Sequence, residues 1–171
     1  RQLIALHSTV GREKCAVLAE RLRDINPALE LTCVPRFIDE SSVDSLLDSA
    51  EFDYAVDAID TLSPRIALIP GTLDRGIPLV SSMGSGGKMD PAALEIADIA
   101  KTHHCPLARV VRGRLHKLGI DRGFTAVFSA EPVREGSVIQ CDEQNKRSNL
   151  GTISYAPAMF GIGGASVVIR G

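Results

Sequence analysis

The sequence predicts an α/β fold with a mainly parallel sheet and crossover helices. Three segments rich in β-forming residues, at 29–37, 54–59 and 78–83, alternate with segments that have helical periodicity. This alternation is typical of parallel strands joined by right-handed helical connections, which place the loops at one edge of the sheet. A composition of 44% hydrophobic and 23% charged residues fits one soluble globular domain over residues 1–171.

Three helices are expected in the first half of the chain. Apolar and charged residues recur with the helical period over residues 11–23, and this helix ends before Pro27. A short helix is predicted over 41–47, where Ser41 and Asp44 in SSVD resemble a capping box. The third helix, 63–73, begins at Ser63-Pro64 because proline suits the first turn of a helix.

The second half of the chain has a different rhythm. A glycine-rich loop, a strand, an amphipathic helix and a strand are expected at 85–91, 94–100, 106–120 and 125–131. Residues 135–150 have no periodicity and many polar side chains, which predicts a mobile surface loop. Residues 156–169 are apolar and glycine-rich but shorter than the roughly 20 residues of a membrane span. We expect a buried helix whose glycines allow close packing.

Charge and cysteine content restrict the functional classes. A net charge of −2 gives no global basic field toward nucleic acid or an anionic membrane, although a local basic face is compatible with it. Cys15, Cys33, Cys105 and Cys141 are widely spaced without a CxxC pair, which disfavours a zinc site and a disulfide scaffold. A reducing, cytoplasmic setting is the simpler interpretation, and the opening residues contain no visible signal peptide.

Two aspartates, Asp57 and Asp60, follow the strand predicted at 54–59. A carboxylate at the carboxyl end of a buried parallel strand is costly without a partner, and ligands of open α/β sheets bind at that edge. The pair can be interpreted as ligands of Mg²⁺ bound with a nucleotide. Asp60 can equally be the N-cap of the next helix, and the residues alone leave both interpretations open.

Three cations are candidates for phosphate contacts. Lys14 lies in the first turn of its helix, where the helix dipole disfavours a cation, so the position suggests a lysine directed at phosphate. The alternative is a solvated lysine beside Glu13. Arg1 and Arg65 could bind phosphate oxygens through their guanidinium groups, or could be surface ion-pair partners.

Other motifs are weaker signals. Residues 84–88, GSGGK, fail as a Walker loop because MDP follows the lysine in place of Ser or Thr and a helix. Residues 161–166, GIGGAS, lack a preceding strand. His103, His104 and Cys105 could form a metal or nucleophile cluster, but adjacent side chains point apart, so a loop before a helix is the default interpretation.

Several collinear segments resemble the ThiF/HesA/MoeB superfamily of ATP-dependent carboxylate-activating enzymes, which are related to ubiquitin-activating enzymes. The resemblance covers nearly the whole chain and is most specific in GGKMDP, ADIAKT and CPLARVVR. Within the superfamily it is closest to the branch of tRNA threonylcarbamoyladenosine dehydratases. The paired CxxC zinc motif of many sulfur-carrier-activating relatives is missing, which favours this branch.

The resemblance implies a Rossmann-like adenylation domain that uses ATP and Mg²⁺. Such an enzyme adenylates the threonyl carboxylate of the modified tRNA adenosine, which then closes into a cyclic form. By this correspondence Arg1 is the arginine of the family's NRQ motif, Lys14 contacts phosphates and Asp60 holds the metal, while Asp57 anchors neighbouring backbone. The family's glycine-rich nucleotide loop and ribose-binding acidic residue precede the NRQ motif, so we expect a fragment that is a poor ATPase alone.

The expected partners are a tRNA substrate, a second copy in a homodimer and a sulfur-transfer protein, with no membrane. Arg109 and Arg112 are three residues apart on one predicted helix face and are candidates for tRNA contacts. A solvated helix face is the alternative for this segment. Two other functions stay open: an adenylating enzyme for a ubiquitin-like sulfur-carrier protein, and a non-catalytic interaction module that kept the fold.

Overall fold

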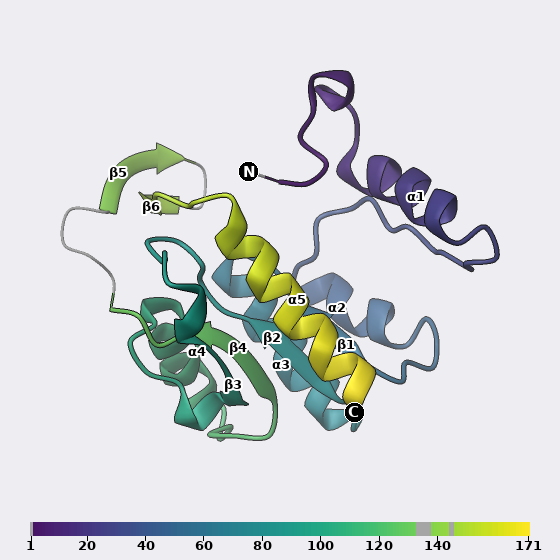
Figure 1. Cartoon of the computed structure of the whole chain (residues 1–171). Helices are drawn as coiled ribbons and strands as arrows, with labels where there is room; N and C mark the ends of the chain where they lie inside the picture. The colour runs from purple at the N-terminus through teal and green to yellow at the C-terminus, as the bar shows by residue number, and fades with distance from the viewer. Residues whose placement is uncertain (1, 133–137, 144–145) are drawn as a thin grey trace. The chain divides into compact units, whose positions relative to one another are not determined.

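The computed structural model describes residues 2–132, 138–143 and 146–171, and side chains are described outside 133–150. The chain divides into two compact units, Arg1–Phe37 and Ile38–Gly171, which we call the N-terminal unit and the sheet unit. Each unit is described by itself below (Figure 1). The single adenylation domain expected over residues 1–171 stays a prediction.

The N-terminal unit contains the short 3-10 helix η1, His7–Thr9, and the helix α1, Lys14–Ile25. The Thr9 hydroxyl donates to the carbonyl of Ile4 and accepts the N–H of Leu6 at 2.9 Å, so the opening segment is folded back as a turn. The predicted amphipathic helix is confirmed. It begins three residues later than expected and ends before Pro27, as predicted.

The strand predicted at 29–37 is wrong. The structure has no regular element in this segment, and nearly all of its residues are exposed. Residues of high β-propensity form a strand only where a partner strand and a surface to pack on are available. The described part of the N-terminal unit has no other strand with which 29–37 could pair, and Pro35 has no N–H to donate.

A four-stranded sheet forms the centre of the sheet unit. Its strands are β1, Ala55–Asp57; β2, Leu79–Ser82; β3, Leu94–Asp98; and β4, Thr125–Ser129. They lie in the order β1-β2-β4-β3, with β1, β2 and β4 parallel and β3 antiparallel to β4. The α/β class and the mainly parallel sheet are therefore confirmed. β3 differs because only a loop and the 3-10 helix η2, Pro91–Ala93, connect it to β2.

Helices cover both faces of this sheet. The helix α5, Tyr155–Arg170, lies across one face, and α3, Leu62–Asp74, lies behind the sheet in the view of Figure 1. The helix α4, Pro106–His116, contributes Val111 and Leu115 to the core. The helices predicted at 63–73, 106–120 and 156–169 are thus confirmed, but α4 ends at His116. The expectation that the last helix is buried is wrong, because α5 is buried along one side only and its Ile162 and Ile169 are exposed. Among the residues described, none of the helices is long and apolar enough to cross a membrane.

Gly163 explains how α5 approaches the sheet. A Cβ atom at this position would lie 3.0 Å from Val127 Cγ1 on β4 and 3.4 Å from Leu94 Cδ2 on β3. A side chain larger than hydrogen would therefore push the helix away from the strands. The prediction that the glycines of GIGGAS serve close packing is confirmed at Gly163.

The short helix α2, Glu40–Leu47, is confirmed, but its predicted cap is wrong. Asp39 is the N-cap residue, and its carboxylate accepts the N–H of Ser42 at 3.0 Å. The hydroxyl of Ser42 accepts the N–H of Asp39 at 2.9 Å, which completes a capping box. Hydrogen bonds from Ser41 and Ser42 lower the pKa of Asp39. Asp44 instead pairs with Arg75, the C-cap residue of α3, at 3.0 Å.

Residues 135–150 contain regular structure that the sequence did not predict. β5, Val138–Glu143, and β6, Lys146–Leu150, pair as antiparallel strands. A segment with many polar residues gives little periodic signal for a strand. The other residues of the predicted loop, 135–137 and 144–145, lie outside the described part of the chain, and the mobility of the segment stays a prediction.

Candidate functional site

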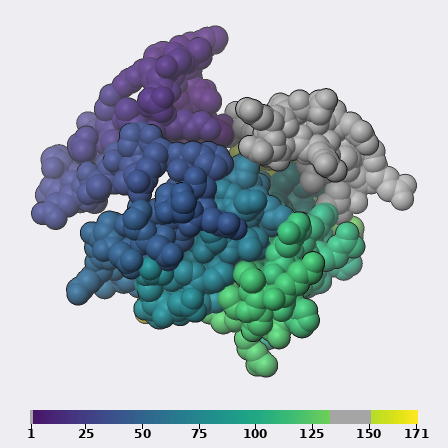
Figure 2. All heavy atoms as spheres, turned by 180° about the vertical axis from the view of Figure 1, so that it is seen from behind, coloured from purple at the N-terminus to yellow at the C-terminus, as the bar shows by residue number. Residues whose placement is uncertain are grey.

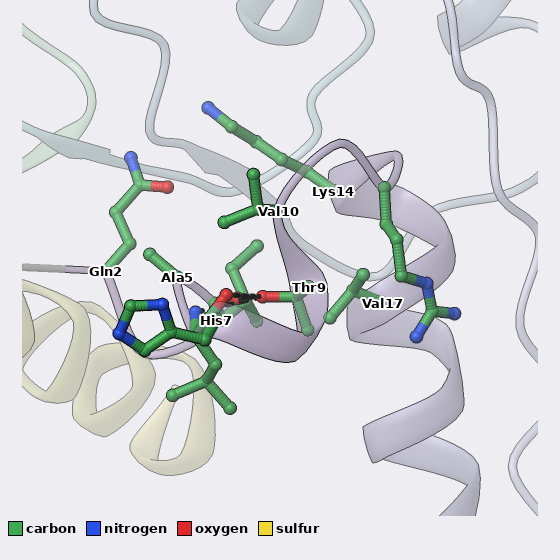
Figure 3. A pocket seen from close by; sticks show the side chains of 10 residues that line it. Gln2, Ala5, His7, Thr9, Val10, Lys14 and Val17 are labelled. Atoms are coloured by element: carbon green, nitrogen blue, oxygen red, sulfur yellow. Dashed lines mark hydrogen bonds between the residues drawn. The ribbon is translucent and has the colours of Figure 1, made fainter.

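A pocket of about 480 Å³ opens in the N-terminal unit (Figure 3). Its lining residues are Gln2, Ile4, Ala5, Leu6, His7, Thr9, Val10, Arg12, Lys14 and Val17. The opening turn supplies most of them, and α1 supplies Lys14 and Val17. Aliphatic walls beside an amide, an imidazole and two cations suit a ligand with an apolar ring and an anionic group.

Lys14 occupies the first position of α1, as predicted, and its side chain is exposed. The N-cap residue Glu13 makes no side-chain capping bond, and no acidic residue lies in the first turn. A lysine at this end of a helix does not stabilise the helix dipole. Its place on the pocket wall is therefore consistent with a contact to a bound anion. Arg1, the other predicted phosphate contact of this segment, lies outside the described residues.

The predicted anchoring role of Asp57 is confirmed. This carboxylate lies at the end of β1 with no solvent exposure. One of its oxygens accepts the N–H of Ile59 at 3.0 Å, and the other accepts the hydroxyl of Ser81 on β2. The second oxygen is also 3.3 Å from Nη1 of Arg65. The cost of a buried carboxylate is thus offset by a complete set of partners within the protein.

Neither interpretation of Arg65 was correct. The residue is only 1% exposed, so it is neither a phosphate contact nor a surface ion-pair partner. From the first turns of α3 its guanidinium donates to the carbonyls of Ile59 and Ser82, and to the hydroxyl of Ser81. Burial lowers the pKa of Arg65, and the charges of Asp57 and Asp60 oppose that shift.

Asp60 is exposed and follows β1 by three residues. The N-cap of α3 is Thr61, which makes no side-chain capping bond, so the interpretation of Asp60 as the cap is wrong. The carboxylate is near enough to Arg65 to raise the pKa of that guanidinium. Asp60 belongs to the sheet unit and Lys14 to the N-terminal unit, so their meeting at one nucleotide stays a prediction.

The glycine-rich loop holds a buried lysine that sequence reasoning missed. Lys88 is only 2% exposed, and its ammonium donates to the carbonyls of His104 at 3.0 Å, Ser129 at 3.3 Å and Glu131. The three carbonyls use all three N–H donors of the ammonium, so no donor is left for a phosphate. This agrees with the exclusion of a Walker loop at this lysine. Burial lowers the pKa of Lys88. A lysine among glycines carries no sequence signal for such burial.

His103 and Cys105 lie in a loop before α4, as predicted. Cys105 is buried at the N-cap, where its sulfur accepts the N–H of Ala108 at 3.5 Å. The ring of His103 packs edge-on against Phe128, and its Nε2 atom is 3.7 Å from a Glu95 carboxylate oxygen. These contacts give structural roles to both residues.

The basic helix α4 presents cations to solvent unevenly. Arg109, Arg114 and Lys117 are exposed. Arg112 is only partly exposed, because its Nη1 donates to the carbonyl of Thr102 at 2.8 Å and to the Thr102 hydroxyl. Figure 2 shows the segment around α4, in green, forming part of the rear surface of the sheet unit. Arg112 is thus hydrogen-bonded within the sheet unit. RNA contacts of Arg109 and Arg112 stay a prediction.

The strand order and the buried ion pair of Asp57 and Arg65 at the carboxyl end of β1 define a Rossmann-like α/β protein. Residues 1–170 match the sequence model of the ThiF family, and the chain belongs to that family.

Relatives within this family are similar in sequence and in structure. The chain is 45% identical over 131 residues to the tRNA threonylcarbamoyladenosine dehydratase of Bacillus subtilis, a match that covers 77% of this chain and 51% of the relative. The solved structure of the Escherichia coli tRNA N6-threonylcarbamoyladenosine dehydratase with ATP is 33% identical, with a TM-score of 0.87. The structure of that protein with AMP is 34% identical, also with a TM-score of 0.87. Both structural matches cover 99% of this chain and 68% of the other.

Proposed function

We propose that this chain takes part in the ATP-dependent dehydration of N6-threonylcarbamoyladenosine in tRNA to its cyclic form. The main support is its similarity, over 99% of its length, to a dehydratase solved with ATP and with AMP. The chain spans about half of the Bacillus subtilis relative, so the activity of the whole protein belongs to the proposal. The dehydratase names of the relatives favour this function over adenylation of a ubiquitin-like sulfur carrier.

The chemistry of the proposal has two steps. In the first, an oxygen of the threonyl carboxylate attacks the α-phosphorus of ATP, the bond to the β-phosphate oxygen breaks, and pyrophosphate leaves. In the second, a nucleophilic atom of the same nucleoside attacks the activated carbonyl carbon, loses its proton and expels AMP. Hydroxide is a poor leaving group, whereas AMP is a good one, so adenylation makes the ring closure feasible.

Cations in the N-terminal pocket would lower the barrier of the first step. Negative charge develops on the leaving pyrophosphate, and a lysine ammonium directed at it stabilises the transition state. Lys14 is exposed on the pocket wall at the start of α1, where it is available for that contact. By the family correspondence, Arg1 supplies a second phosphate contact.

Asp60 fits a Mg²⁺ ion that accompanies the nucleotide. Its carboxylate is exposed after β1, where ligands of open α/β sheets bind, and it is not used as the cap of α3. Carboxylate oxygen is the ligand that Mg²⁺ prefers, with phosphate and water in its other positions. Mg²⁺, when bound, supplies positive charge to the phosphates.

The remaining partners also belong to the proposal. The exposed cations Arg109 and Arg114 on α4, with Lys117 at its C-cap, offer positive charge to a tRNA backbone. A tRNA substrate is consistent with a cytoplasmic location, as are the exposed free thiols of Cys15 and Cys33. A homodimer and a sulfur-transfer partner were expected from the family resemblance and remain predictions.

Nucleoside analysis of tRNA tests the proposed function. Deletion of the gene should convert cyclic threonylcarbamoyladenosine to the open form, and the full-length wild-type gene should restore the cyclic nucleoside. A Lys14→Ala gene serves as the inactive comparison. If tRNA from the deletion strain keeps its cyclic nucleoside, the proposal is wrong, and a small partner protein with a Gly-Gly tail should then be sought.

A further inference from the structure

Buried charged side chains hold both backbone polar groups of Ile59. Its N–H donates to Asp57 Oδ1 at 3.0 Å. Its carbonyl accepts from Arg65, through Nε at 3.1 Å and also through Nη2. The Ile59 carbonyl belongs to the peptide plane between Ile59 and Asp60, and the Ile59 N–H belongs to the plane before it. Arg65 therefore holds the peptide plane that leads into Asp60, and Asp57 holds the preceding one.

The two groups that hold Ile59 are themselves fixed. Asp57 and Arg65 form an ion pair at 3.3 Å, and they are 0% and 1% exposed. Nη1 of Arg65 also donates to Ser81 Oγ at 3.1 Å and to the Ser82 carbonyl at 2.9 Å, both on β2. A buried pair with these additional hydrogen bonds has little freedom to reorient. Through these bonds the turn after β1 is held in a fixed position against β2.

We propose that Arg65 is a positioning residue for Asp60. Through the carbonyl of Ile59 it sets the direction in which the chain presents the Asp60 carboxylate to a Mg²⁺ ion bound with a nucleotide. This inference rests on the proposed function of Asp60. Rotation of the peptide between Ile59 and Asp60 would swing the carboxylate, and a misplacement of about 1 Å can cost about 100-fold in rate.

The role requires arginine in particular. Nε and Nη2 lie on one edge of a planar guanidinium, so they can hold the single Ile59 carbonyl while Nη1 reaches β2. A lysine at position 65 would keep a positive charge beside Asp57 but would lose this planar fork. Arg65→Lys should therefore preserve the ion pair and release the peptide plane.

The test measures metal binding directly in the full-length protein. Mn²⁺ serves as a paramagnetic probe for the Mg²⁺ position, and its dissociation constant is measured by electron paramagnetic resonance with saturating ATP. Arg65→Lys should weaken Mn²⁺ binding tenfold or more and raise the Mg²⁺ concentration needed for half-maximal activity. The control is Val111→Ala in the core helix α4, which lowers stability without touching the turn.

A double variant separates positioning from general loosening. If Arg65 acts through Asp60, Arg65→Lys should weaken Mn²⁺ binding little further when Asp60→Asn is already present.

Ser81→Ala removes a hydroxyl partner shared by Asp57 and Arg65. It should weaken Mn²⁺ binding in the same direction as Arg65→Lys, but by less. This second variant keeps the test decisive if Arg65→Lys fails to fold.

Three results would overturn the proposal. The first is a Mn²⁺ affinity within twofold of wild type in every folded variant of Arg65 or Ser81. The second is a loss of Mn²⁺ affinity in Val111→Ala as large as that in Arg65→Lys. The third is full additivity of the effects of Arg65→Lys and Asp60→Asn on Mn²⁺ affinity. Failure of the proposed function is recognised separately. In that case deletion of the gene leaves the tRNA nucleosides unchanged, although the wild-type protein binds Mn²⁺ and ATP. The Mn²⁺ affinities of the Arg65 variants then still test the positioning role.

Discussion

Lys88 holds the backbone of Glu131, and the Glu131 side chain holds the backbone of the two residues that follow Lys88. The Lys88 ammonium donates to the carbonyl of Glu131, and the Glu131 carboxylate accepts the N–H groups of Met89 at 2.6 Å and Asp90 at 2.9 Å. The loop after β2 is thereby fastened to the segment after β4. Tyr155 adds a further tie, because its hydroxyl donates to the Met89 carbonyl at 2.7 Å.

We predict that Lys88→Met lowers the free energy of unfolding by roughly 1–3 kcal/mol at pH 7, because three carbonyls lose their donors. Removal of a buried charge offsets part of this loss. Burial lowers the pKa of Lys88, so between the folded pKa and the unfolded value of about 10.4 the unfolded state binds more protons. The contribution of Lys88 to stability should therefore increase as pH rises through that window.

Urea unfolding from pH 7 to pH 10 checks both parts of this prediction. The difference between wild type and Lys88→Met should widen with pH, whereas Lys117→Met, at an exposed position of the same unit, should show no such trend. A difference that narrows with rising pH would mean that the ammonium is stabilised, not penalised, by its buried site.

Gly163→Ala should destabilise the protein, because its new methyl group would lie 3.0 Å from Val127 Cγ1. Overpacking of this kind costs about 1–3 kcal/mol. Gly161→Ala, two residues away on the same helix, is the matched control, since a Cβ there meets nothing within 4 Å. That change should stabilise α5 by up to about 1 kcal/mol. Equal effects in urea unfolding would show that α5 can move away from the sheet at no cost.

Sequence reasoning predicted the elements whose signals are local. The helices at α1, α3 and α5 follow from periodicity and from the placement of proline and glycine, and tertiary contacts did not override them. The strand expected at 29–37 failed for the opposite reason. A strand depends on a partner elsewhere in the chain, and β-propensity alone does not report whether that partner is available.

The roles of the residues in the candidate site likewise depend on whether their partners are near or distant in the sequence. The anchoring role of Asp57 was implied by the family resemblance, whereas the residues alone allowed Asp57 to be a ligand of Mg²⁺, an interpretation that its burial among protein partners contradicts. The roles of Arg65 and Lys88 could not be predicted. Arg65 reaches a carbonyl 17 residues away, and Lys88 reaches one 43 residues away, so only the folded chain brings these groups together.

Lys14→Ala in the full-length protein should abolish adenylation while leaving the fold nearly unchanged. The side chain is exposed at the start of α1, so its loss costs little stability, whereas a phosphate contact contributes to the transition state. The measurement is ATP-pyrophosphate exchange, with the exposed Lys101→Ala as the matched control. Turnover within a factor of about 10 of wild type, worth roughly 1.4 kcal/mol, would contradict a phosphate contact.

Asp60→Asn should impair the response to Mg²⁺ more than the affinity for ATP. The amide keeps the shape of the side chain but loses the charge that holds the metal. Thr61, and not Asp60, is the N-cap of α3, so the variant should still fold, and thermal unfolding checks that it does. Titration of activity with Mg²⁺ is compared with Asp53→Asn, an exposed aspartate before β1. Normal activity at every Mg²⁺ concentration would remove Asp60 from the metal site.

Arg109 and Arg112 should separate RNA binding from folding. Arg109 is exposed, so Arg109→Ala should leave stability unchanged and reduce the slope of log affinity for tRNA against log salt by about 1. Arg112 donates to the Thr102 carbonyl, so Arg112→Ala should lower stability by about 1 kcal/mol. Filter binding of tRNA across a salt series, with Lys101→Ala as a control, measures the slope. An unchanged slope in Arg109→Ala, with ATP binding intact, would move the RNA-binding surface away from α4.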